Sequence, residues 1–199
     1  AAFPAWARLT PSFAARSALS FFVVSRVAAS VASSVATSAA VVPRPPIVDP
    51  ATIDFSHIAY DIEAIRKINK QRFEMEQLTA IVSMDIPKQI VIAYKDVTEN
   101  EFWVRGHIPG RPLMPGVVMC EAAAQTASFF LHFVTDEPPE FIGFGGLEDV
   151  RFRGTVVPGD RFVVVGHIIS LKRRLFTFDA QAFVGAKMVF EGKILGVPI

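Results

Sequence analysis

The spacing of apolar residues predicts two helices in the chain. From Ile62 to Ile68, isoleucines recur at helical spacing, with acidic residues at the front and basic residues behind, an order that suits the helix dipole. Gly116–Val134 is apolar almost all the way round and has no Gly or Pro in its interior, which is typical of a buried helix. We expect Pro138-Pro139 to end this second helix.

Other segments have the composition and alternation of strands. They are Phe73–Met84, Gln89–Val97, Phe141–Val157 (one or two strands), Arg161–Leu171, Leu175–Val184 and Lys187–Leu195. The short Asp85–Lys88 connection indicates a hairpin between the first two. The helix from Gly116 is too apolar to face water, so the economical arrangement is a curved antiparallel sheet wrapped around it. The predicted fold class is α+β.

The first 48 residues differ from the rest of the chain. They are rich in Arg, Ser and Ala and contain no acidic residue, whereas the chain from Asp49 onward has 16 basic and 19 acidic residues, a net charge of −3. This composition is typical of an organellar transit peptide, with a stretch translated from a misassigned start as the alternative. Prolines between positions 43 and 50 mark the boundary. We therefore expect a leader at 1–48 and a single folded domain at 49–199.

Composition argues against several classes of protein. The net charge of +1 argues against a nucleic-acid-binding protein. The sequence also lacks the long apolar run, free of polar residues, that a membrane span needs. The single cysteine, Cys120, allows no internal disulfide and has no metal-ligand spacing around it. We expect no metal and a reducing compartment. The expected location is cytoplasmic, or an organelle if the leader is a genuine transit peptide.

The segment before the second helix carries the first candidate for chemistry. Prolines and glycines recur through the loop Thr98–Pro115, so a stiff backbone holds His107 in place. The helix begins near Pro115, and its first N–H groups, at Gly116 and Val117, have no intrahelical acceptor. Such donors at a helix N-terminus can hold a polarised carbonyl oxygen.

Glu121 is the second candidate. It lies on a helix whose other residues are nearly all apolar, so its carboxyl group either finds a partner or stays protonated. A protonated carboxyl group in an apolar cleft is a competent general acid. Gln125, four residues on, shares the same helix face and is positioned to hydrogen-bond to it.

Together these groups match the elimination of water from a 3-hydroxyacyl thioester. A base must take the C2 proton, an acid must protonate the departing 3-hydroxyl, and donors must hold the thioester oxygen. His107, Glu121 and the N–H groups of Gly116 and Val117 would fill these roles in that order. Taken singly, a loop histidine or a buried glutamate is more often structural.

Two motifs resemble a known family. Val97–Gln125 reads VTENEFWVRGHIPGRPLMPGVVMCEAAAQ and closely resembles FabZ-type 3-hydroxyacyl-[acyl-carrier-protein] dehydratases, whose signature is GHFPGxPxxPGV followed by a helix reading xxxEAMAQ. Gly145–Asp160 resembles the family's later strand and VPGD turn. The resemblance implies the hotdog fold and dehydration of (3R)-3-hydroxyacyl-[acyl-carrier-protein] to the trans-2-enoyl product in fatty acid biosynthesis.

The resemblance also implies an assembly and a partner. Family members are homodimers in which the histidine of one subunit faces the glutamate of the other, and they often assemble further into trimers of dimers. No dissociable cofactor is implied, because the substrate arrives on the phosphopantetheine arm of acyl carrier protein. Basic candidates for docking this acidic carrier are Arg105, Arg111, Arg151, Arg153, Lys172, Arg173 and Arg174.

The chain departs from the family pattern at two places. Ile108 stands where the family has Phe after the histidine, and Lys70–Met75 only weakly represents the family's PHRYPFLLVDR segment. The first change keeps an apolar residue, while the second leaves the preferred acyl length open. The alternatives are another hotdog enzyme, an acyl thioesterase or a CoA-linked hydratase/dehydratase, and a catalytically silent hotdog subunit.

Overall fold

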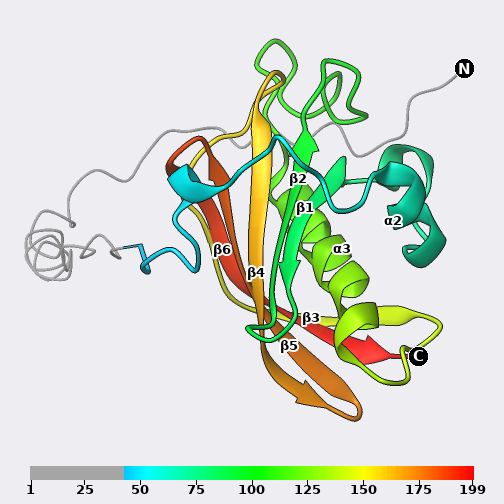
Figure 1. Cartoon of the computed structure of the whole chain (residues 1–199). Coiled ribbons are helices and arrows are strands. Elements are labelled where there is room, and N and C mark those ends of the chain that lie inside the picture. Colours follow the sequence, from blue (N-terminus) through cyan, green and yellow to red (C-terminus); the bar gives the residue numbers. More distant parts are fainter. Residues whose placement is uncertain (1–42) are drawn as a thin grey trace, which may run out of the picture. The chain divides into compact units, whose positions relative to one another are not determined.

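Six strands form one antiparallel sheet around a long helix in this computed structural model, which describes residues 43–199. The strands, in chain order, are β1 (Ala80–Asp85), β2 (Ile90–Asp96), β3 (Ile142–Phe152), β4 (Arg161–Lys172), β5 (Leu175–Val184) and β6 (Lys187–Pro198). The helices are η1 (Pro50–Thr52), α2 (Ile62–Ile68), η2 (Phe73–Met75) and α3 (Gly116–Val134). The sheet order is β1-β2-β4-β5-β6-β3, so β1 and β3 are its edges, and the sheet curves around α3 (Figure 1).

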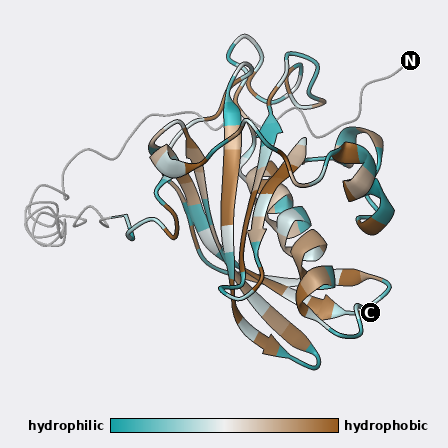
Figure 2. Cartoon of the chain, viewed as in Figure 1, coloured by the Kyte–Doolittle hydropathy of each residue, from teal (hydrophilic) through white to brown (hydrophobic). Residues whose placement is uncertain are grey.

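Helix α3 forms the centre of the hydrophobic core. Phe129 and Phe130 on the helix are fully buried, as are Phe178 and Phe190 on the facing strands. Figure 2 shows hydrophobic residues along the helix and along the strands beside it. The helix is long and apolar enough to cross a membrane, but most of it is buried within the fold, and that burial accounts for its composition.

The bounds of α2, α3 and β5 coincide with the segments predicted from the sequence. The expectation of a strand throughout Phe73–Met84 is wrong in its first half. Phe73 has a φ of 57°, in the left-handed region, which turns the chain into η2 and delays β1 to Ala80. Helix α3 also ends before Pro138, since Thr135 caps it and donates its hydroxyl to the Leu131 carbonyl at 2.9 Å.

An N-terminal arm, residues 43–55, covers the face of the sheet that points away from α3. Its apolar side chains, which include Ile47 and Phe55, pack against a second buried cluster on that face. Arg44 pairs with Asp179 at 2.8 Å and with Glu191 at 2.9 Å. The compact unit therefore begins at Pro43, six residues before the expected boundary, because residues of the predicted leader bind the sheet.

Candidate active site

The loop before α3 holds His107 through backbone and side-chain hydrogen bonds. The Trp103 carbonyl accepts the His107 N–H at 2.7 Å, and the Leu113 carbonyl lies 2.7 Å from His107 Nδ1. A carbonyl oxygen only accepts, so Nδ1 carries a proton. In the neutral ring, Nε2 is then left with its lone pair free, and the exposed imidazole presents it as a base.

Three anchors keep this loop in place. Lys95 on β2 pairs with Glu101 at 3.2 Å, and the side chain of Glu101 is only 8% exposed. At the far end of the loop, the Met114 N–H donates to the Val156 carbonyl at 2.8 Å. Between them, the Arg111 N–H donates to the Ile108 carbonyl and closes a tight turn. The second residue of this turn is proline and the third is Gly110, whose φ is 81°, as in a type II turn. The predicted stiffness of the loop therefore has visible causes.

A buried amide network holds Glu121 on α3. Gln125 is 2% exposed, and its Nε2 donates to Glu121 Oε1 and to the Met75 carbonyl, each at 2.7 Å. Its Oε1 accepts the Gln77 N–H at 2.9 Å, which sets the orientation of the amide. Gln71 Nε2 lies 3.5 Å from the same Glu121 oxygen. The predicted contact between Gln125 and Glu121 is present, and the carboxyl group has found partners.

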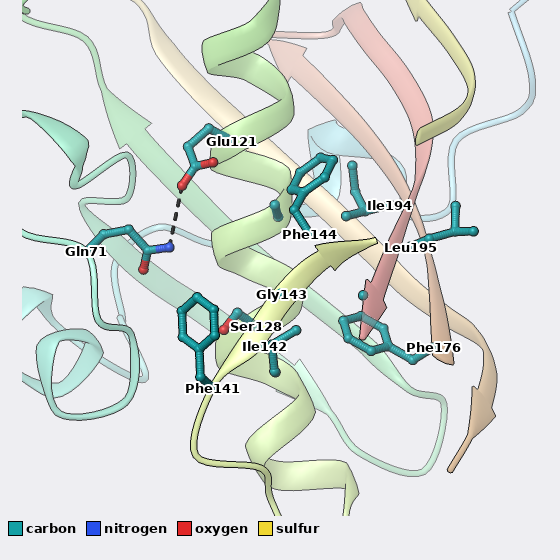
Figure 3. Close-up of a pocket in the computed structure, with 12 residues that line it drawn as sticks. Gln71, Glu121, Ser128, Phe141, Ile142, Gly143, Phe144, Phe176, Ile194 and Leu195 are labelled. Carbon is teal, nitrogen blue, oxygen red and sulfur yellow. Dashed lines mark hydrogen bonds between the residues drawn. The ribbon is translucent and has the colours of Figure 1, made fainter. Parts of the chain in front are cut away.

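Glu121 opens onto a cavity of about 210 Å³ between α3 and the sheet. Gln71, Ala124, Ser128 and Phe176 are among its lining residues, together with backbone and side chains of β3 and β6 (Figure 3). His107 is not among the described residues that line it. Within one chain the structure thus gathers Glu121, Gln125 and a cavity lined mostly by apolar residues, but His107 does not line that cavity.

The start of α3 has the predicted free donors. The first backbone hydrogen bonds of the helix run from Val118 and Met119 to the Pro115 carbonyl, at 2.9 and 3.3 Å. The N–H groups of Gly116 and Val117 precede these bonds and have no acceptor within the helix. A side chain at Gly116 would meet the ring of Phe152, 2.7 Å from its Cβ, so glycine lets this aromatic ring pack closely against the start of the helix.

The basic residues predicted to dock a carrier do not form one surface. Arg105 and Arg111 are exposed on the loop of His107, and Arg151 is exposed on β3. Lys172 is the exposed last residue of β4, and Arg173 and Arg174 form the exposed turn to β5. Arg173 lies near Thr135, at the other end of α3. Arg153 does not fit the docking role, because its side chain is 15% exposed and donates from Nε to Glu191 at 2.7 Å.

Other ionisable groups add no site. Among residues 43–199, no three His, Cys, Asp or Glu side chains are grouped so that they could hold a metal ion. Cys120 is buried within α3, and burial raises the pKa of its thiol. A thiol that resists ionisation is a poor nucleophile, consistent with a place in the core.

Comparison with known proteins identifies the family. Residues 69–193 match the FabA-like domain. The chain belongs to the FabA-like family. This match includes His107, the start of α3 and Glu121, and it leaves out the N-terminal arm. The chain resembles the FabZ type, because it is 34% identical over 139 residues to the bifunctional enzyme LpxC/FabZ of Chlorobaculum tepidum. That alignment covers 69% of this chain and 30% of the bifunctional enzyme.

Solved structures agree with the hotdog fold of the FabA-like domain. The dehydratase heterocomplex ApeI:P of Xenorhabdus doucetiae superposes with a TM-score of 0.58, at 11% identity, over 68% of this chain and 90% of the other. Cj0977, a sigma28-regulated virulence protein of Campylobacter jejuni, superposes with a TM-score of 0.54 at 18% identity, over 73% of this chain and 95% of the other. The predicted α+β hotdog architecture is confirmed.

The sequence did not single out Gln71 and Gln77 as site residues. Gln71 reaches Glu121 from 50 positions away, and Gln77 reaches Gln125 from 48. The nearest signal is that Lys70–Met75 stands where the FabZ-type family has its PHRYPFLLVDR segment. That comparison indicates the region of the chain but not which side chain points into the site.

Proposed function

We propose that this chain dehydrates (3R)-3-hydroxyacyl-[acyl-carrier-protein] to trans-2-enoyl-[acyl-carrier-protein] in fatty acid biosynthesis. The observation that carries the proposal is the placement of Glu121. Its carboxyl group is held by Gln125 at a cavity lined mostly by apolar residues inside a FabA-like domain. Apolar lining residues suit an acyl chain, and a carboxyl group beside them can serve as a general acid.

In the proposed reaction His107 Nε2 takes the proton from C2 of the substrate. The developing negative charge moves onto the thioester oxygen, which the Gly116 and Val117 N–H groups stabilise. Glu121 protonates the 3-hydroxyl, the C3–O bond breaks, and water leaves as the C2–C3 double bond forms. Because Gln125 donates to Oε1, the transferred proton is carried by Oε2.

We propose further that a second copy of the chain supplies His107. The histidine lies outside the cavity of its own protomer, so the site is incomplete in one chain. Strand β3 is an edge of the sheet and exposes Phe144, Leu147 and Phe152. An apolar edge strand is a surface that favours pairing with another copy. The neighbourhood of Gly116 and Phe152 places the start of α3 at this edge.

The acyl carrier protein would dock where its thioester can reach His107. Arg105 and Arg111 lie two and four residues from this histidine and are exposed. An acidic carrier that binds them should bind more weakly as salt is raised. Charge reversal of these two arginines should raise KM for the carrier-linked substrate, whereas reversal at Lys172 and Arg173 should leave it unchanged. A Michaelis constant independent of salt would contradict carrier docking on basic residues.

The reaction itself is tested by incubating the full chain with a 3-hydroxyacyl carrier substrate. Enoyl product that forms without free thiol supports dehydration. Free thiol without enoyl product would instead show a thioesterase and overturn the proposal.

Sharing of the site is tested by mixing two inactive variants. His107→Ala and Glu121→Gln chains carrying different tags are combined, and the mixed dimers are purified. One site in a mixed dimer has both native residues and the other has neither, so we expect about half the native activity. Mixed dimers as inactive as either parent would show that both residues must come from the same chain.

A further inference from the structure

Two cavities lie in succession along one face of α3. Glu121, Ala124 and Ser128 line the first, which is the proposed acyl site, and Leu131 and Thr135 line the second. These positions are spaced by three or four residues throughout, so they form one continuous stripe of the helix. The second cavity has a volume of about 330 Å³, larger than the 210 Å³ of the first.

Strand β6 runs past the cavities in the same order. Leu195 and Gly196 line the first, and Pro198, two residues on, lines the second. The helix and the strand thus agree that the second cavity extends the first away from Glu121. Figure 3 shows Glu121 and Phe176 well apart within the first cavity.

Phe176, the second residue of β5, belongs to the walls of both cavities. The residue is 2% exposed. Gly196 is its partner across the β5–β6 pair, and a Cβ there would lie only 2.0 Å from the Phe176 ring. The ring therefore packs directly on the Gly196 backbone, and a side chain at position 196 would clash with it.

We propose that Phe176 closes the far end of the acyl site and sets the longest acyl chain that the protein accepts. This inference rests on the proposed function for its substrate class. The seven steps from Glu121 to Ser128 rise about 10 Å along the helix. An extended chain advances about 3.5 Å over three bonds, or about 1.2 Å per carbon. The first cavity then holds about eight carbons beyond C3, and longer chains meet the Phe176 ring.

Replacing the ring should join the two cavities. In the Phe176→Ala chain, we expect the ratio of kcat/KM on a sixteen-carbon substrate to that on an eight-carbon substrate to rise roughly tenfold or more, because each newly buried methylene adds about fourfold in affinity. Phe176→Leu should give an intermediate ratio. The measurement is kcat/KM on a series of 3-hydroxyacyl carrier substrates from four to eighteen carbons, with the unsubstituted chain as the reference.

Phe178→Leu is the matched control. Phe178 is a fully buried ring on the same strand, and it does not line either cavity. Its loss should lower the melting temperature as a core substitution does, yet leave the chain-length ratio unchanged. An identical ratio in the native chain and Phe176→Ala would overturn the proposal, as would an equal rise in Phe178→Leu.

Binding separates this inference from the reaction. The probes are saturated acyl-pantetheine thioesters of increasing length, which cannot be dehydrated, and calorimetry measures their affinity for the same variants. In the native chain affinity should stop rising with length near the limit set by Phe176, and in Phe176→Ala it should continue to rise. If binding shows this change and no variant forms enoyl product, the proposed reaction fails while the role of Phe176 stands. If the length limit in binding is the same in the native chain and in Phe176→Ala, the role proposed for Phe176 is refuted.

Discussion

The side-chain amide of Gln125 joins Glu121 to a separate segment of the chain. Its Nε2 donates to Glu121 Oε1 at 2.7 Å, while its Oε1 accepts the Gln77 N–H at 2.9 Å. The Gln77 bond fixes which way the amide faces, and so it decides that Glu121 Oε1 is an acceptor. The orientation of the proposed acid therefore depends on a residue 44 positions away in the sequence.

Gln125→Leu should damage both stability and turnover. The buried Gln77 N–H would lose its partner, which costs about 1–3 kcal/mol of unfolding free energy, and the Met75 carbonyl would lose its hydrogen bond as well. Without its donor, Glu121 would lose its set position, and we expect kcat to fall about ten- to hundredfold with little change in KM.

Thr126→Val provides the comparison for Gln125→Leu. Thr126 is equally buried, and its hydroxyl donates to the Ala122 carbonyl at 2.8 Å, away from the amide network. Urea unfolding should show a loss of stability in both variants, whereas steady-state kinetics should show the loss of kcat only in Gln125→Leu. Equal kcat values would contradict a positioning role for the amide.

His107→Ala and Glu121→Gln should each lower kcat by about 10²- to 10⁴-fold, the contribution typical of general acid–base groups. Neither should unfold the protein. His107 is exposed, and a glutamine at 121 keeps an oxygen that can accept from Gln125. Circular dichroism melts measured beside the activity check both statements, and near-native turnover in either variant would refute the assignment.

Gly116→Pro tests the backbone donor directly. Proline lacks the N–H but suits the first position of a helix, and Pro115 already has the extended conformation, at ψ 139°, that a following proline requires. We expect kcat to fall about 10²- to 10³-fold, as for other lost oxyanion donors. Gly116→Ala adds the same Cβ beside Phe152 but keeps the N–H, so it should lose much less activity. Equal losses in the two variants would show that the effect is steric.

Acid should weaken the attachment of the N-terminal arm to the sheet. Burial alone would raise the pKa of Glu191, but hydrogen bonds from Arg44 and Arg153 outweigh it, so its pKa is lowered in the folded chain. The carboxyl group of Glu191 therefore binds a proton more readily in the unfolded chain than in the folded one. The stability that the ionised Glu191 contributes is fully present above its ordinary pKa of 4.5, and it is lost as the pH falls through the lowered pKa of the folded chain.

Glu191→Gln isolates this contribution. Urea unfolding of the native chain and of this variant should differ most near neutral pH, and the difference in unfolding free energy should shrink as the pH falls below about 4.5. A difference that stays constant with pH would show that the ionised carboxylate contributes nothing to the arm.

Local chemistry made much of this protein readable from its sequence. The helical spacing of apolar residues placed α2 and α3 at the observed bounds, and a Pro/Gly-rich loop ahead of a helix start led to His107, Gly116 and the nearby Glu121. Such signals lie within one or two turns of chain, where periodicity, φ restriction and the unpaired N–H groups of a helix end act directly.

Contacts between distant segments were decided only by the tertiary structure. The Gln77 N–H bonds to Gln125, and Arg153 bonds to Glu191 although the sequence made it a candidate for carrier docking. The ring of Phe176 packs on Gly196, where it lines two cavities. Arg44, which the sequence had assigned to a leader, binds the outer face of the sheet. These contacts depend on strand order, register and packing, which are settled by the free energy of the whole core and not by any one stretch of residues.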